Sequence, residues 1–188
     1  SGASAEGQHS CGLSTTGAVY CWGYGTAGRL GNGFEVQRLV PGPVVTSTEL
    51  AFTDVYVGLH SCGVTLDGST YCWGTAASGR LGGGSSRDSA VPVIVSLPVG
   101  VTTRSVSVGS NHSCSVTSTG AAYCWGNDNY GQLGNGTLPG GAIPSLVELP
   151  LGVDLRGIAV GPNHTCGVAM DGSAYCWGLG VEGRLGNG

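Results

Sequence analysis

The 188-residue sequence contains no lysine. Its fixed positive charges are seven arginines, against eleven acidic residues, which gives a formal net charge of −4. Proteins that bind nucleic acid carry a basic patch or stripe, so we expect no nucleic acid among the partners. No apolar run approaches the about 20 residues of a membrane-spanning helix, and no charged-then-apolar signal segment stands at the start. We therefore expect no membrane span and a chain that is mature or trimmed.

Glycine, by contrast, makes up 37 of the 188 residues, well above the roughly 7% that is usual. It shows no collagen period. Apolar residues amount to 40% of the sequence and charged residues to 10%, whereas disordered chains combine low hydrophobicity with high net charge. The glycines are therefore interpreted as turns in a packed β protein.

One stretch, HSCGLSTTGAVYCWG, occurs in four related copies, which begin at His9, His60, His112 and His164. The copies contain all eight cysteines, all four histidines and all four tryptophans, and successive tryptophans lie 51, 52 and 52 residues apart. A fixed period of this length indicates a repeat architecture. Because a catalytic site is normally built once, residues that recur in every repeat point to a structural role.

The second repeat shows the strands of one unit. Its segments DVYVG, HSCGV, STYCW and AVPVIV are short and apolar, and turn residues separate them. Four short strands in about 51 residues are typical of a β-propeller blade. The sequence thus predicts an all-β protein with four blade units, at residues 1–33, 34–84, 85–136 and 137–188.

A glycine ends the three-residue turn between the second and third strands of every copy. It stands at Gly17, Gly68, Gly120 and Gly172. This position, in a type I turn followed by a glycine bulge, needs a positive φ. Counting outward from the turn places the two cysteines of each copy opposite each other, within reach of a disulfide. We expect one disulfide per hairpin: Cys11–Cys21, Cys62–Cys72, Cys114–Cys124 and Cys166–Cys176.

A metal site is the alternative interpretation of the same residues. His9 and Cys11 share a strand face and Cys21 lies opposite, which makes a Cys₂His zinc site geometrically imaginable. It would lack a fourth protein ligand in every repeat, and the CxxC pairs of zinc and redox sites do not occur. We therefore expect no metal and no cofactor. Eight evenly paired cysteines also indicate an oxidising compartment, extracellular or periplasmic.

Each CWG is followed by four variable residues and then by Gly-[Arg/Gln]-Leu-Gly, as in WGYGTAGRLGNG and WGNDNYGQLGNG. The variable residues are candidate contact loops, because tyrosine is enriched at interfaces. For the arginines, hydrogen bonds to backbone carbonyls of a neighbouring loop are favoured over contacts with a ligand. The candidate contact residues are Tyr24, Arg29, Arg80, Asn127, Tyr130, Glu182 and Arg184.

The stretch GSNHSCSVTSTGAAYCWGNDNYGQLGNG resembles the repeats of the regulator of chromosome condensation family, and the resemblance covers essentially the whole chain. It implies a β-propeller, usually of seven blades, that works through protein–protein contacts, with the repeat histidine in a structural role. The cysteines depart from the usual repeat and are similar to those of disulfide-bearing secreted versions. Among the functions found in the family, a disc that presents variable loops, as in a secreted β-lactamase inhibitor, fits better than nuclear nucleotide exchange.

The sequence contains four of the cysteine hairpins. Only three complete segments, which we call connectors, link one hairpin and its glycine-rich loop to the next hairpin, at residues 34–57, 85–108 and 137–160. Three arrangements would explain this count. The chain is a piece of a longer propeller, or two copies close an eight-bladed disc, or the blades stack into an open superhelix or fibre. We expect the first, with further blades completing a ring of about seven.

We find no group of catalytic residues outside the positions that recur in every repeat. There is no Ser/His/Asp set among the other residues, and Asp67 and Asp171 are turn residues. We predict a non-enzymatic extracellular scaffold that binds a protein or a surface ligand through variable loops on one face, or that associates with itself. A structural subunit of an extracellular fibre or surface layer is the alternative, and a secreted enzyme or enzyme inhibitor is less favoured.

Overall fold

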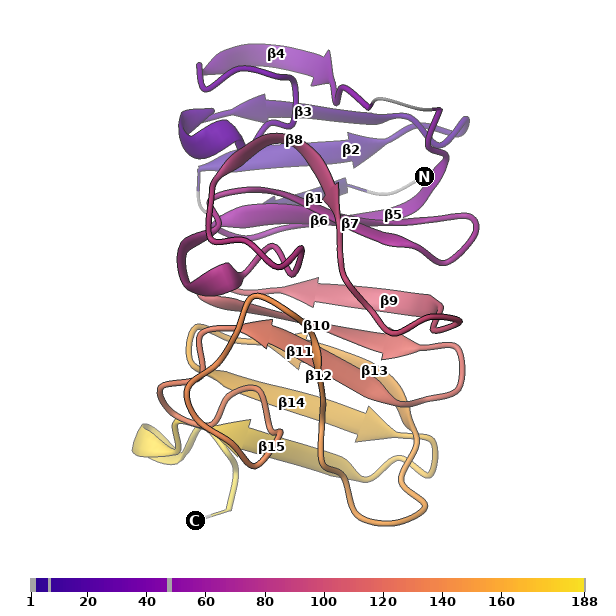
Figure 1. Ribbon diagram of the computed structural model, residues 1–188, viewed down its shortest axis with the longest axis vertical. Helices are drawn as coiled ribbons and strands as arrows, with labels where there is room; N and C mark the ends of the chain where they lie inside the picture. The colour runs from indigo at the N-terminus through magenta and orange to yellow at the C-terminus, as the bar shows by residue number, and fades with distance from the viewer. Residues whose placement is uncertain (1–2, 7, 47–48, 188) are drawn as a thin grey trace.

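The computed structural model describes residues 3–6, 8–46 and 49–187. Its regular structure consists of four antiparallel β-sheets, which follow one another along the long axis of the molecule in sequence order (Figure 1). No helix in the described ranges is long and apolar enough to cross a bilayer. Single turns of 3-10 helix occur in the loops: η1 (Thr26–Gly28), η2 (Ala77–Gly79) and η3 (Val181–Gly183).

Each sheet is one blade, with its strands hydrogen-bonded to one another in chain order. Blade 1 contains β1 (Ala3–Glu6), β2 (His9–Leu13), β3 (Val19–Gly23) and β4 (Arg38–Pro43). Blade 2 contains β5 (Phe52–Val57), β6 (His60–Thr65), β7 (Thr70–Gly74) and β8 (Ser89–Ile94). Blade 3 contains β9 (Thr103–Val108), β10 (His112–Thr117), β11 (Ala122–Gly126) and β12 (Ser145–Leu146). Blade 4 contains β13 (Leu155–Val160), β14 (His164–Ala169) and β15 (Ala174–Gly178). The prediction of an all-β protein with four blade units is confirmed.

The hairpin turns have the predicted geometry. The four turn glycines have φ between 80° and 93°, in the left-handed region that only glycine enters without strain. The Ser14 N–H donates to the Ala18 carbonyl over 2.9 Å, and Leu13 faces Val19 as counted from the turn. The turn therefore sets the register of the whole hairpin.

All eight cysteines form the four predicted disulfides, and none is free. Their Cα atoms lie 4.0–4.1 Å apart, slightly less than the about 4.5 Å of an antiparallel pair that exchanges no backbone hydrogen bonds. Because every sulfur is in a covalent bond, no thiolate is available to a metal ion. The zinc interpretation of the repeated Cys/His cluster is therefore wrong.

The sheets do not begin and end where the predicted repeat units do. Blade 2 runs from Phe52 to Ile94, whereas the predicted unit is 34–84. The fourth strand of a blade comes from the connector that follows the glycine-rich loop, and the same connector then supplies the first strand of the next blade. The sequence unit and the blade are consequently offset by one strand.

Successive blades share a buried apolar junction. Trp125 of blade 3 is 0% exposed and packs with Leu81 and the Cys62–Cys72 disulfide of blade 2. Gly82 makes room for it, because a Cβ there would lie 2.7 Å from the Trp125 Nε1. Trp73 occupies the same place against blade 1. The tryptophans of the second, third and fourth repeats thus pack into the core of the preceding blade.

A polar relay crosses the same junctions. The His60 Nε2 lies 2.6 Å from the Ser113 hydroxyl of the next blade, and that hydroxyl donates to the Arg80 carbonyl over 3.3 Å. Since the hydroxyl has one hydrogen to give, the Nε2 of His60 must carry a hydrogen and donate it. The Trp125 indole N–H donates to the same carbonyl. The other junctions repeat the relay as His9–Ser61–Arg29 and His112–Thr165–Gln132.

Candidate protein-binding face

The direction of the strands places every loop that follows a third strand at the same end of its blade. We call this end the loop face, and it comprises residues 24–37, 75–88, 127–144 and 179–187. The hairpin turns lie at the opposite end, which we call the turn face. Figure 1 shows the 3-10 turns of the loop face on the left and the hairpin turns on the right.

The first three loops are fixed by their repeated leucine. Leu30, Leu81 and Leu133 are almost completely buried. Gly79, with φ +78°, lies so close to blade 3 that a Cβ would approach the Ala142 Cα to 2.4 Å. Gly28 approaches Ala90 of blade 2 in the same way, so the frame pins the first two loops to the following blade and leaves most of their variable residues on the outside.

The two tyrosines predicted as contact residues are exposed on this face. Tyr24 is 42% exposed and Tyr130 is 50% exposed. The Arg29 guanidinium is buried, lies 5.2 Å from the centroid of the Tyr24 ring and donates to the Thr26 carbonyl. This cation–π contact holds the aromatic ring in place. Arg29 thus acts on the face through Tyr24.

Arg80 is buried as well, and its guanidinium donates to the carbonyls of Ala77 and Ser110. Arg184 donates to the Val181 carbonyl over 2.8 Å and forms an ion pair with the exposed Glu182. Carbonyls of a neighbouring loop were the expected acceptors, and among the three arginines only Arg80 reaches one, that of Ser110. Arg29 and Arg184 donate to carbonyls of their own loops instead.

Asn127 is half-buried and structures its own loop. Its side-chain oxygen accepts hydrogen bonds from the Asn129 backbone N–H and from the Gln132 amide. Gln132, which stands where the other repeats have arginine, in turn accepts from the Tyr130 backbone N–H over 2.9 Å. In blade 3 an amide network thus takes the place of the guanidinium, and it orients the backbone that presents Tyr130.

Four further apolar side chains stand on the loop face that the sequence interpretation did not single out. They are Phe34, Val36, Leu138 and Ile143, each at least 60% exposed. They lie in the first parts of the connectors 34–57 and 137–160, outside the variable residues that were predicted as contact loops. The available signal was a large apolar residue between the GNG-type turn and the proline-containing fourth strand.

The variable residues include one strained position in three of the loops. Ala27, Ser78 and Glu182 have φ of 59°, 60° and 61°, a left-handed conformation that costs a non-glycine residue about 1 kcal/mol. We expect Ser78→Gly to raise the free energy of unfolding by about 0.5–1 kcal/mol, measured by urea denaturation. Ala77→Gly in the same turn, where φ is not positive, is the matched control and should lower it; equal effects would contradict the strain.

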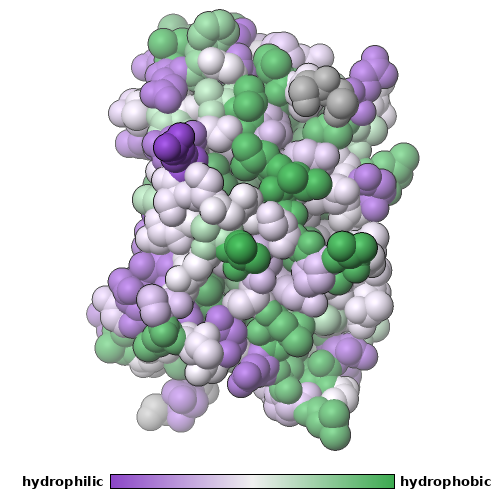
Figure 2. All heavy atoms as spheres, in the orientation of Figure 1, coloured by the Kyte–Doolittle hydropathy of each residue, from purple (hydrophilic) through white to green (hydrophobic). Residues whose placement is uncertain are grey.

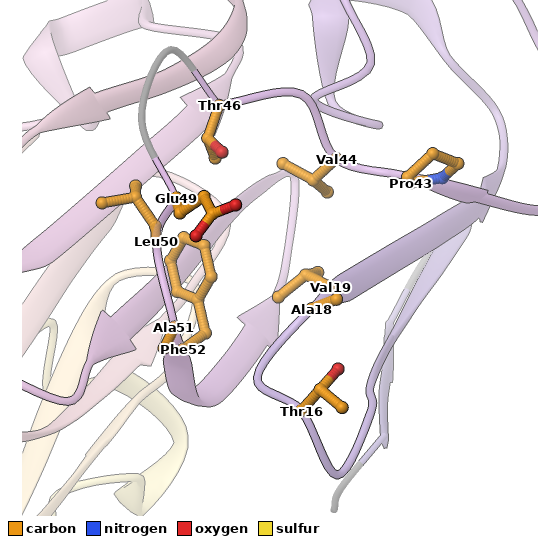
Figure 3. Close-up of a pocket in the computed structure, with 10 residues that line it drawn as sticks. All are labelled: Thr16, Ala18, Val19, Pro43, Val44, Thr46, Glu49, Leu50, Ala51 and Phe52. Carbon is orange, nitrogen blue, oxygen red and sulfur yellow. The ribbon is translucent and has the colours of Figure 1, made fainter.

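The turn face has a cavity of about 470 Å³ beside the first hairpin. Figure 3 shows Thr16, Val19, Val44 and Phe52 around it, with the Glu49 carboxylate at its edge. Among the described residues that line it, Glu49 is the one that ionises. In the part of the chain that the structure describes, no group of three or more His, Cys, Asp or Glu side chains is placed to hold a metal. Figure 2 shows apolar residues interspersed with polar ones over the visible side.

Two comparisons with known proteins concern sequence. Residues 16–64, 67–116 and 119–168 match the regulator of chromosome condensation (RCC1) repeat, and a second form of this repeat matches 104–132 and 156–184. The chain is 36% identical to the human E3 ubiquitin-protein ligase HERC2, over 99% of this chain and 4% of that protein. It is 33% identical to the ultraviolet-B receptor UVR8 of Arabidopsis thaliana, over 90% of this chain and 39% of the receptor.

Solved structures agree in fold. Human WBSCR16 superposes with a TM-score of 0.88 at 23% identity, covering 99% of this chain and 49% of that one. Yeast RCC1 (Prp20), in a complex with Kap60, superposes with a TM-score of 0.84 at 24% identity, covering all of this chain and 45% of that one. The chain spans less than half the length of each of these proteins. With three full repeats matched in sequence and the blades superposed, the chain belongs to the regulator of chromosome condensation (RCC1) repeat family.

Proposed function

We propose that this chain is part of a non-enzymatic β-propeller scaffold that binds a protein partner through its loop face, in the extracellular space or the periplasm. The observation that carries the proposal is the row of exposed aromatic and apolar side chains, Tyr24, Phe34, Tyr130 and Leu138, on loops pinned to a rigid frame. Tyrosine and other large apolar groups dominate the binding energy of protein interfaces. A pre-organised loop also loses little entropy on binding.

The relatives support a binding role. The solved structures include yeast RCC1 (Prp20) bound to Kap60, and Prp20p was also described with its binding properties to Gsp1p and histones. HERC2 is a ubiquitin ligase, but this chain covers only 4% of it. We therefore propose protein binding for this chain on the basis of the relatives, and we do not propose ligase activity.

The compartment is proposed from the disulfides. Four cross-strand disulfides, three of them with both cysteines completely buried, suit an oxidising environment. Blocking free thiols in the source cells before lysis, followed by mass spectrometry, tests this. We expect all eight cysteines to be unmodified by the blocking reagent, and a chain that arrives with blocked thiols would contradict the proposed location.

The binding face is tested with the double variant Tyr24→Ala/Tyr130→Ala. The purified chain is cross-linked to proteins of the culture medium or periplasmic fraction, and the affinity of each captured protein is then measured by surface plasmon resonance. Loss of two interface tyrosines should weaken binding by about 10- to 100-fold. Tyr20→Ala is the matched control, because Tyr20 has similar exposure (40%) but lies on β3 away from the loops. Equal affinity of the wild type and the double variant would refute the loop face as the binding site.

A further inference from the structure

The second and third connectors contain a leucine-proline-x-glycine segment that the first connector lacks. Its leucines, Leu97 and Leu149, pack against the cores of blades 2 and 3. All three connectors have 24 residues, so their positions correspond one to one. In the first connector Thr46 stands at the leucine position and Glu49 at the glycine position. Blade 1 therefore has a short polar side chain where the next two blades have a packed leucine.

The cavity of about 470 Å³ on the turn face lies at this position, at the junction between blades 1 and 2. Thr46 lines it, together with the apolar side chains of Val19, Val44, Leu50 and Phe52, which Figure 3 shows around the open space. Because threonine is smaller than leucine, space that a leucine fills in the next two blades stays open. The volume falls within the about 300–1,000 Å³ of small-molecule sites, whose walls are mostly apolar with a few polar groups.

Backbone hydrogen bonds hold both walls of the cavity. The Val44 N–H donates to the Val19 carbonyl, and the Phe52 N–H donates to the Gly17 carbonyl, each over 2.9 Å. The Phe52 side chain is 5% exposed, and its ring meets the Trp73 ring edge to face. The walls are therefore already in place before a ligand enters, so binding orders few additional groups of the protein.

The charge at the edge of the cavity is negative. Glu49 is exposed there, and none of the residues that the structure describes donates a hydrogen bond to its carboxylate or forms an ion pair with it. A second hollow of about 280 Å³ shares Glu49 and Leu50 with the cavity and adds the Asp67 carboxylate. The described residues that line the two hollows include no arginine and no histidine. The charge complement of this place is therefore a cation.

We propose that the cavity binds a small organic amine, a primary ammonium group on an apolar alkyl or aryl body. The ammonium pairs with the Glu49 carboxylate, and the apolar body packs against Val44, Leu50 and Phe52. A hydrogen bond between two charged groups is stronger than one between neutral groups, so the carboxylate selects the amine over uncharged molecules of the same shape. The cavity and the loop face lie at opposite ends of the blades, so this site does not depend on the proposed protein binding.

The test uses the whole 188-residue chain and 3-phenylpropylamine as the probe, followed by amide NMR. The amine should give saturable shifts at the amides of residues 16–19, 44–46 and 49–52, with a Kd on the order of 1 mM, as for other ligands of this size. The alcohol 3-phenylpropanol has the same apolar body without the charge and should bind about 5-fold more weakly. No saturable shift up to about 10 mM amine, ten times that Kd, or equal affinity for the alcohol, would overturn the proposal.

Two substitutions separate the space from the charge. Thr46→Leu restores the leucine of the other connectors, so it should fill the cavity, abolish the saturable shifts and raise the urea midpoint. Glu49→Gln keeps the shape and should weaken binding of the amine by about 5-fold, with the affinity for the alcohol unchanged. Glu35→Gln, at an exposed position of the loop face, is the matched control and should change neither affinity. Binding that survives Thr46→Leu, or that Glu35→Gln weakens as much as Glu49→Gln, would refute the site.

Discussion

Acidification from pH 7 to pH 4 is expected to lower the free energy of unfolding by about 6 kcal/mol, enough to unfold many domains. Burial, with a smaller effect of Arg29, lowers the pKa of His9 from 6.5 to about 4, and burial beside His164 lowers the pKa of His112 to about 4. A pKa lowered in the folded state gives stability that is complete above the unfolded value and is lost as the pH falls toward the folded value. Each of these two histidines then contributes about 3 kcal/mol.

The geometry of the His–hydroxyl–carbonyl relay explains why protonation of these histidines destabilises the fold. The Nδ1 atoms of His9, His60 and His112 are buried without a hydrogen-bond partner, so a proton added there meets no acceptor. For His60, burial and then the charges of Arg80, His112, His9 and Arg29 all lower the pKa well below its usual value. Protonation of one histidine therefore also disfavours protonation of its neighbour.

Other ionisable groups titrate outside the range from pH 7 to pH 4, or change the free energy of unfolding in the opposite direction. Hydrogen bonds lower the pKa values of Asp67 and Asp171, so their contributions are lost only below about pH 4. Burial raises the pKa of Asp128, so its protonation favours the folded state as the pH falls. Urea unfolding at a series of pH values measures the total loss, and comparison of the wild type with His60→Gln, which keeps an N–H donor for Ser113 but does not titrate, isolates the contribution of His60. Stability that is flat from pH 7 to pH 4 would contradict the mechanism.

Trp125→Ala is expected to lower the free energy of unfolding by about 3–5 kcal/mol, as large-to-small changes of buried aromatic residues do. Trp125 joins two blades: its ring packs in the core of blade 2, and its indole N–H donates to the Arg80 carbonyl over 2.8 Å. Its removal opens a cavity at the junction of the two blades. The rigid loops around the cavity cannot collapse to fill it. The measurement is the urea midpoint together with the slope of the unfolding curve.

Two variants calibrate this effect. Trp125→Phe keeps most of the packing and removes the N–H, and because Ser113 still donates to the same carbonyl the cost should be about 1 kcal/mol. Trp22→Ala changes the equivalent residue of blade 1, which is half-buried. Because less of its surface is buried, it should cost less than Trp125→Ala. Similar losses for Trp22→Ala and Trp125→Ala would show that the junction is not what Trp125 stabilises.

Part of the candidate site could be predicted from the sequence. Tyr24 and Tyr130 stand out as variable aromatic residues beside an invariant frame, and both are exposed. The burial of Arg29 under Tyr24 could not be predicted, because the direction of a long side chain depends on how the loop folds back over its blade. Phe34 and Leu138 were missed for a related reason: their place between the GNG-type turn and the fourth strand is visible in the sequence, but the exposure of an apolar side chain there depends on how the loop packs.

The sequence by itself determined what short-range geometry controls. The period, the turn glycine and the two-residue alternation of a strand placed Cys11 opposite Cys21, and the same count served every hairpin. Only the tertiary structure decided which residues meet between blades, for example that His60 reaches Ser113 and that Trp125 fills blade 2. Those partners are about one repeat apart, and their contact depends on the rotation between sheets. No local pattern encodes that rotation, because it follows from packing all the blades together.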